Sequence, residues 1–184
     1  MIVSNVSSFQ LPDPAGRAGG ACTSALLNVL YKNKTKSTRE LTFREVLLMM
    51  RVLLSAKDFD QIPQLSSSRN FDLSTKFDLA PEGFSGTKRA VMIGINYVGQ
   101  DGELSGCHND VLNMKEYLMD VHGFKEENIT LLLDDRVHVN PTYYNMMNAY
   151  QKIVRESEPG DVVYLHYSGK IFCLKYLLVI FCSK

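Results

Sequence analysis

The stretch Ala90-Val-Met-Ile-Gly-Ile95 is a continuous apolar run in an otherwise mixed sequence. Such a run is typical of a parallel strand that is buried on both faces of a sheet. Apolar residues then recur at helical spacing from Val111 to Val121, and Gly123 stands where a C-cap glycine would end that helix. Two more apolar runs, Ile129–Leu133 and Val162–Tyr167, predict a second and a third strand.

A second crossover helix is predicted between the last two of these strands. It opens at Thr142, carries apolar side chains on one side, and stops at Glu158-Pro-Gly160. The alternation of strands and helices predicts an α/β fold in three layers around a mainly parallel sheet. Ligands of such folds bind at the carboxyl ends of the strands, which are Asn96-Tyr97, Asp134-Asp135 and Ser168-Gly169.

The segment before this pattern is predicted to be mainly helical. After a tail at residues 1–18, the apolar spacing predicts a helix over Ala21–Tyr31. Thr42 and Glu45 have the spacing of a capping box, which predicts the start of a second helix. Residues 61–68 are expected to form a short extended segment.

The 184-residue chain has the composition of a globular protein, with 45% hydrophobic and 22% charged residues. Its 20 Lys and Arg balance its 20 Asp and Glu, so charge gives no argument for a nucleic acid or a membrane as partner. The four cysteines show neither metal-ligand spacing nor a disulfide framework, which favours reduced thiols and a cytoplasmic location. The N-terminus lacks a signal-peptide pattern, and the apolar run after Lys170 is shorter than the roughly 20 residues of a bilayer span.

Six motifs follow one another in the second part of the chain: Lys88–Tyr97, Leu104-Ser-Gly-Cys-His-Asn-Asp-Val111, His122-Gly-Phe124, Leu133-Asp-Asp135, Pro159-Gly-Asp161 and His166-Tyr-Ser-Gly169. Their order and spacing resemble the large-subunit half of the metacaspases, a family of caspase-like cysteine peptidases. The resemblance implies a caspase-like three-layer sandwich and a cysteine-type endopeptidase activity. It also implies that complete members of the family use calcium.

The first part of the chain resembles the small-subunit half of the same family. Gly19–Leu27 is similar to a helix near the end of that half, Leu41–Leu47 to the following helix, and Gln61–Ser68 to the closing strand. This half precedes the large one here, as in type III metacaspases; a junction between two tandem peptidase domains is the alternative. The predicted division is a tail (1–18), a small-subunit-like segment (19–80), a linker (81–87), a partial large-subunit-like domain (88–169) and an apolar tail without family resemblance (170–184).

The residues that would carry catalysis are missing from the motifs. In the family, Tyr-Ser-Gly is followed by the histidine that acts as general base, whereas Tyr167-Ser-Gly169 is followed here by Lys170. A lysine with a pKa of about 10.4 is protonated at neutral pH and cannot accept the proton of a thiol. The family's nucleophilic Asp-x-Cys motif does not occur in residues 170–184. We therefore expect a truncated metacaspase that is inactive as written.

Two other functions fit parts of the pattern. The first is a non-catalytic homologue that binds or regulates a complete metacaspase. The second, an unrelated nucleotide-binding domain, is weakened because no glycine-rich phosphate loop follows the first strand. In a truncated metacaspase, the third predicted strand or its neighbour would leave an open sheet edge, which the apolar tail could cover as a strand or a helix.

The resemblance implies that Cys107, Asp110 and Ser168 line the pocket for the substrate residue before the cut, and that Asp110 selects Arg or Lys of a polypeptide. Plainer interpretations are packing for Cys107, a turn for Ser168, and for Asp110 an acidic residue favoured by the helix dipole. Cys107 is also a candidate nucleophile, because a helix start lowers a thiol pKa. His166 is expected to be a structural strand histidine, and no metal site is expected in this chain.

Overall fold

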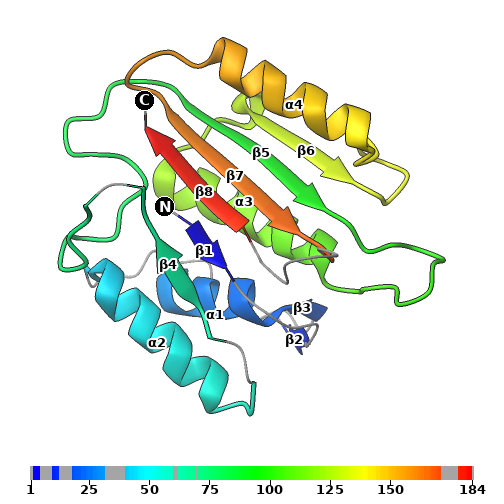
Figure 1. Cartoon of the computed structure of the whole chain (residues 1–184), viewed down its shortest axis with the longest axis horizontal. Coiled ribbons are helices and arrows are strands. Elements are labelled where there is room, and N and C mark those ends of the chain that lie inside the picture. The colour runs from blue at the N-terminus through cyan, green and yellow to red at the C-terminus, as the bar shows by residue number, and fades with distance from the viewer. Residues whose placement is uncertain are drawn as a thin grey trace.

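The computed structural model describes residues 2–4, 10–12, 18–31, 40–59, 62–68, 70–170 and 178–183. Its elements are β1 (Ile2–Ser4), β2 (Gln10–Pro12), β3 (Ala18–Gly20), α1 (Ala21–Leu30), α2 (Phe43–Ser55), β4 (Gln64–Ser66), β5 (Lys88–Gly94), α3 (Cys107–His122), the 3-10 helix η2 (Glu126–Asn128), β6 (Ile129–Leu133), α4 (Tyr143–Glu156), β7 (Val162–Ser168) and β8 (Leu178–Ser183). Six strands form one sheet in the order β4-β1-β8-β7-β5-β6 (Figure 1), and β2 pairs with β3 separately.

The three strands predicted from apolar runs form the parallel part of the sheet. β5 lies between β6 and β7 and runs parallel to both, with Gly94 opposite Leu133 on one side and Ser168 on the other. β5 is buried from Ala90 to Gly94, as expected for a central strand that is covered on both faces. This α/β architecture confirms the predicted fold class.

The sheet continues beyond β7 in three antiparallel pairings. β8 pairs with β7 and with β1, and β1 pairs with β4. Residues 1–18, expected to be a tail, therefore contain β1 and β2. The edge of β7 is covered by β8, which is one of the two ways in which the apolar tail was expected to cover it. The part of that predicted tail at 171–177 lies outside the described residues.

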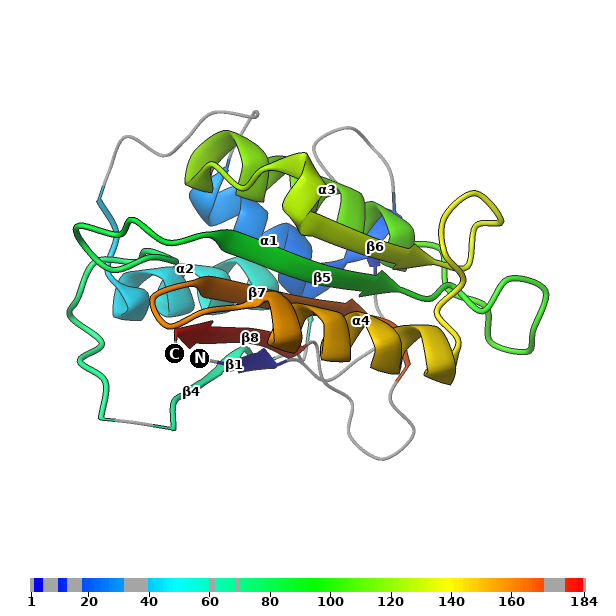
Figure 2. The same cartoon turned by 90° about the horizontal axis from the view of Figure 1, so that it is seen from above.

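Helices cover both faces of the sheet (Figure 2). On one face, α1, α2 and α3 enclose the larger apolar core, which includes Met50, Met92, Leu118 and Tyr164. On the other face, Ala149 and Ile153 of α4 pack with apolar residues of the parallel strands. Within the described residues, no helix is both long and apolar enough to cross a bilayer.

Local sequence signals set the ends of the helices. The hydroxyl of Thr42 accepts the N–H of Glu45, whose carboxylate accepts the N–H of Thr42, so the predicted capping box opens α2. Gly123 ends α3 in the left-handed conformation with φ of 64°, as predicted for a C-cap glycine. Thr142 caps α4. The start of α3 lies beside the carboxyl end of β5, where the backbone N–H of Cys107 donates to Oδ1 of Asn96.

Candidate functional site

The three residues predicted to line a pocket lie together at the carboxyl end of the parallel strands. Cys107 opens α3, Asp110 lies in its first turn, and Ser168 ends β7. The hydroxyl of Ser168 donates a hydrogen bond to Oδ2 of Asp110 at 2.7 Å. All three residues are buried, and Asp110 is only 3% exposed. The fold thus joins a strand end and a helix start that are far apart in the sequence.

Gly20 reaches this site from the N-terminal part of the chain. Its backbone N–H donates a hydrogen bond to Oδ1 of Asp110 at 2.7 Å. A Cβ atom on Gly20 would lie 2.4 Å from Oδ2 of Asp110, so this close approach of the backbone requires glycine. This contact was not predicted, because the Gly19-Gly20 pair ahead of α1 signals a close approach of the backbone but not its partner.

The carboxyl group of Asp110 has an unusual protonation equilibrium. Burial raises its pKa to about 7, and the hydrogen bonds from Ser168 and Gly20 only partly oppose that rise. Asp110 therefore changes charge near neutral pH. A cation placed beside it would favour the ionised form, because opposite charges stabilise each other in a buried site.

The two cysteines whose side chains the structure describes are buried free thiols. Burial raises the pKa of Cys107 to about 12 and that of Cys22 to about 12. The backbone N–H of Cys107 donates to Oδ1 of Asn96 at 2.9 Å, which fixes the start of α3 to the end of β5. Since the thiolate is the reactive form of cysteine, both groups are poor nucleophiles at neutral pH.

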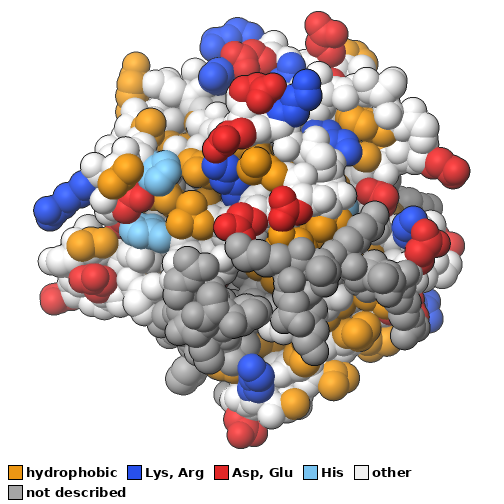
Figure 3. Space-filling model, turned by 180° about the vertical axis from the view of Figure 1, so that it is seen from behind, with side chains coloured by type: hydrophobic (Ala, Val, Ile, Leu, Met, Phe, Trp, Pro, Cys, Tyr) orange, Lys and Arg blue, Asp and Glu red, His pale blue; other side chains and the backbone are white. Residues whose placement is uncertain are grey.

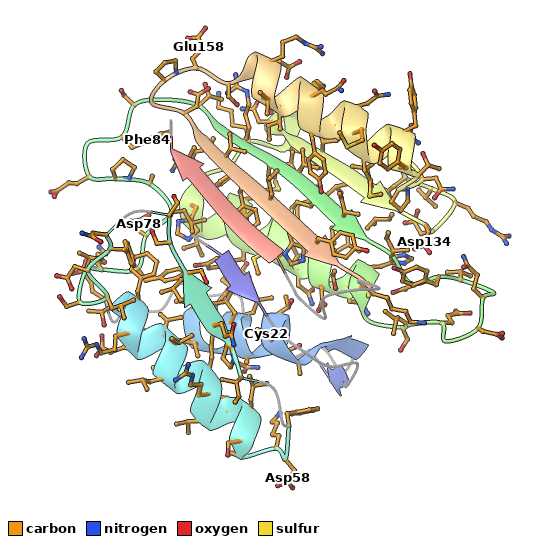
Figure 4. The ribbon with its side chains drawn as sticks, in the orientation of Figure 1. Cys22, Asp58, Asp78, Phe84, Asp134 and Glu158 are labelled. Atoms are coloured by element: carbon orange, nitrogen blue, oxygen red, sulfur yellow. The ribbon has the colours of Figure 1, made fainter. Side chains whose placement is uncertain are left out.

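Two carboxylates follow β6 at the same edge of the sheet, and Figure 4 labels the first, Asp134. Asp134 accepts the backbone N–H groups of Asn96 at 2.8 Å and Tyr97 at 2.7 Å, and it contacts Nε2 of His108. Asp135 accepts two N–H groups of its own turn. Among the side chains that the structure describes, no three His, Cys, Asp or Glu residues cluster as a metal site requires.

Asp134 holds the connection after β5 in a strained conformation. Tyr97 has a φ of 56°, which is uncommon for a residue other than glycine. Burial alone would raise the pKa of Asp134, but the hydrogen bonds from Asn96, His108 and Tyr97 outweigh it and hold that pKa below its usual range. The carboxylate therefore acts as a fixed, ionised acceptor for this loop.

Replacing Asp134 with alanine should lower the free energy of unfolding by about 2–4 kcal/mol, because two backbone N–H groups lose their acceptor. Asp135→Ala is the matched control: Asp135 also accepts two backbone N–H groups, but they belong to its own exposed turn, where water can replace the lost acceptor. Urea denaturation should show a smaller loss for that control. Equal losses in the two variants would mean that Asp134 has no special role in this loop.

Lys170 occupies the position where the family resemblance places the general base. Its backbone carbonyl accepts hydrogen bonds from the hydroxyls of Tyr97 at 2.9 Å and Tyr167 at 3.0 Å. Its ammonium lies 5.2 Å from the centre of the Tyr97 ring and 3.5 Å from the carbonyl oxygen of Asp101. These contacts hold a positive charge at the edge of the site.

His166 lies inside β7 and takes no part in this arrangement of hydrogen bonds. It is 1% exposed, and neither ring nitrogen has a hydrogen-bond partner among the described residues. Burial lowers its pKa to about 4, so the ring is neutral at physiological pH. Tyr164 stacks on it with ring centres 6.5 Å apart.

Charged side chains are mixed on the surface around these elements. On the face shown in Figure 3, acidic and basic side chains lie among apolar ones, in line with the equal numbers of both in the sequence. Two charged side chains of the site are withdrawn from the surface to different extents, because Asp110 is buried and Lys170 is half-buried.

Comparisons with known proteins agree with the motifs. Residues 88–175 match the family model described as "Metacaspase, peptidase C14 domain". The chain is 57% identical over 168 residues to Metacaspase III c of Phaeodactylum tricornutum, a match that covers 91% of this chain and 50% of that protein. It is 42% identical over 99 residues to Metacaspase-1A of Neurospora crassa, covering 49% of this chain and 22% of that protein.

The first of these matches extends over both parts of the chain, since it covers 91% of the chain. The matched part of the chain spans 50% of the length of that relative and 22% of the length of the Neurospora protein. The ordered motifs, the α/β fold and these matches lead to one conclusion: the chain belongs to the metacaspase family.

Proposed function

We propose that Cys107, Asp110 and Ser168 form the pocket that receives an Arg or Lys side chain in a cysteine endopeptidase of this family. The observation that carries the proposal is the buried hydrogen bond between Ser168 and Asp110, at 2.7 Å. It places an acidic group at the carboxyl end of the parallel strands, where ligands of α/β folds bind. The polypeptide substrate and its basic residue before the cut follow from this pocket.

The chemistry of Asp110 supports a cationic ligand. A carboxylate has about four acceptor positions on its two oxygens, and the hydrogen bonds from Gly20 and Ser168 use one position on each oxygen. The remaining positions match the parallel donors of a guanidinium group. A bound Arg or Lys would also offset the burial that raises the pKa of Asp110 to about 7.

Hydrolysis is proposed for the complete peptidase and not for this chain alone. Lys170 stands at the position of the general base, and burial raises the pKa of the Cys22 and Cys107 thiols to about 12. A calcium requirement and a cytoplasmic location belong to the same proposal for the complete protein. The second candidate function, non-catalytic binding of basic peptides or of a complete metacaspase, is favoured by Lys170 in place of a base.

A peptide with an arginine amide at its end should bind the chain about tenfold tighter than the same peptide with citrulline, a neutral isostere of arginine. The reason is a charge-assisted hydrogen bond to Asp110, which is worth about 1.5–3 kcal/mol. The preference should grow as the pH rises through about 7, because the Asp110 carboxyl ionises there. Isothermal titration calorimetry at pH 6 and pH 8 measures both effects.

Asp110→Asn is the test substitution, because it keeps the shape of the side chain and removes its charge. The preference for arginine should disappear in this variant, whereas Asp135→Asn should keep it. Equal binding of arginine and citrulline by the unmodified chain would overturn the proposed pocket. Peptide hydrolysis that is lost in Cys107→Ala, with or without calcium, would instead show that Cys107 is a nucleophile.

A further inference from the structure

The positive charge of Lys170 is not neutralised within the described part of the chain. No carboxylate there forms an ion pair with its ammonium, which contacts the carbonyl oxygen of Asp101 and the face of the Tyr97 ring. Gly102 also lies against it: a Cβ on that glycine would be 2.4 Å from Nζ of Lys170. The side chain is half-buried, so an anion can still reach it.

The backbone of Lys170 is held in place from two sides. The hydroxyls of Tyr97 and Tyr167, at the ends of β5 and β7, both donate to its carbonyl oxygen. Two hydroxyl donors on one carbonyl fix the position from which the lysine side chain extends. The contacts of its ammonium with the Tyr97 ring and the carbonyl oxygen of Asp101 also order the side chain, so a ligand that binds Lys170 loses less free energy to ordering than it would at a mobile surface lysine.

Lys170 follows the proposed pocket directly along the chain. Ser168 contacts Asp110, and Lys170 is two residues further on, so the Cα atoms of Ser168 and Lys170 lie within about 7 Å of each other. The site therefore offers a buried acid and, two residues beyond the serine that contacts it, a cation without an ion pair among the described residues. A residue that carries both a basic side chain and a carboxylate complements this pair of charges.

We propose that Lys170 binds the terminal α-carboxylate of a peptide that ends in Arg or Lys, while the basic side chain enters the pocket of Cys107, Asp110 and Ser168. The inference rests on the proposed function of that pocket and adds the second half of the ligand. Such peptides are the products of cleavage after a basic residue. An internal Arg or Lys has no free carboxylate and gains nothing from Lys170.

The test compares two peptides of one sequence that end in arginine, one with a free carboxylate and one with a terminal amide. We expect the free acid to bind the full chain about five- to tenfold tighter than the amide at pH 8. This factor is what a partly exposed ion pair with one charged hydrogen bond contributes. Lys170→Gln should abolish the difference, and Lys170→Arg should keep it. Calorimetry gives the affinities, and circular dichroism checks that each variant is folded.

The outcomes separate the two proposals. Equal affinity of acid and amide, with arginine still preferred over citrulline, overturns the role of Lys170 and leaves the pocket intact. A preference for the acid that persists in Lys170→Gln also overturns it, because another group then binds the carboxylate. Failure of every arginine peptide to bind overturns both proposals.

Discussion

Substituting Asp110 with asparagine is expected to stabilise the protein progressively as the pH rises from about 4 to about 7, relative to the unmodified chain. Burial raises the pKa of this carboxyl from 3.8 to about 7. Between these values the unfolded chain has lost the proton while the folded protein keeps it, so folding becomes less favourable with rising pH. The slope is about 1.4 kcal/mol per pH unit, which sums to about 4 kcal/mol.

The asparagine variant carries no titrating group at this position, so its free energy of unfolding does not decrease with rising pH for this reason. Urea denaturation at several pH values between 4 and 7, on both proteins, gives the difference in the free energy of unfolding. Asp135→Asn is the control, because Asp135 is a turn carboxylate whose pKa lies near 2 and does not titrate in this range. A difference between Asp110→Asn and the unmodified chain that does not change with pH would show that Asp110 is not held neutral by burial.

His166→Leu is expected to have the opposite pH dependence. Burial lowers the pKa of this imidazole from 6.5 to about 4. As the pH falls through this range, the unfolded chain binds a proton that the folded protein does not bind. The free energy of unfolding therefore decreases by about 3 kcal/mol between pH 6.5 and pH 4. The leucine variant has no such loss, and its advantage over the unmodified chain should be largest near pH 4.

The substitution also removes two ring nitrogens that have no hydrogen-bond partner among the described residues. Replacing an unsatisfied polar group with an apolar one is close to neutral or stabilising, so we expect no large loss at pH 7. Denaturation across the same pH range tests this. A His166→Leu protein that loses several kcal/mol at pH 7 would indicate that the imidazole makes a necessary polar contact.

The two groups oppose each other in the unmodified protein. Asp110 lowers stability as the pH rises and His166 raises it, and their pH ranges overlap between about 4 and 6.5. Their combined contribution should therefore vary little there, while each single variant exposes the pH dependence of the other group. Additive behaviour of the double variant would show that the two sites titrate independently.

The parallel core could be predicted because its signals are local. A continuous apolar run marks β5, Ile129–Leu133 has the bounds of β6, and a glycine closes α3 at Gly123. Each of these features is decided by residues within a few positions of one another. The same holds for the capping box that opens α2.

The antiparallel part of the sheet could not be predicted in the same way. β1 has three residues, and its partners, Gln64–Ser66 and Val179–Ile180, are distant in the sequence. A strand this short carries no periodic pattern, and its existence depends on the pairing itself. The contact between Gly20 and Asp110, 90 positions apart, was missed for the same reason.

The sequence named the residues of the candidate site but did not indicate their burial or their protonation. The motif residues Cys107, Asp110 and Ser168 lie together, and their role as the lining of a substrate pocket stays a prediction. The sequence could not show that Asp110 is buried deeply enough to titrate near neutrality, because burial depends on how α1, α3 and β7 pack. Nor could it show that the backbone of Lys170 is held by two tyrosine hydroxyls.

The most direct test of the basic-residue pocket is the pKa of Asp110 itself, measured by carbon NMR of the labelled carboxyl with and without a peptide that ends in arginine amide. The free protein should give a pKa of about 7. Binding of the guanidinium should lower it by at least about one unit, since an opposite charge favours the ionised form. Saturation with the peptide and an unchanged pKa would contradict the assignment of Asp110 as the floor of the pocket.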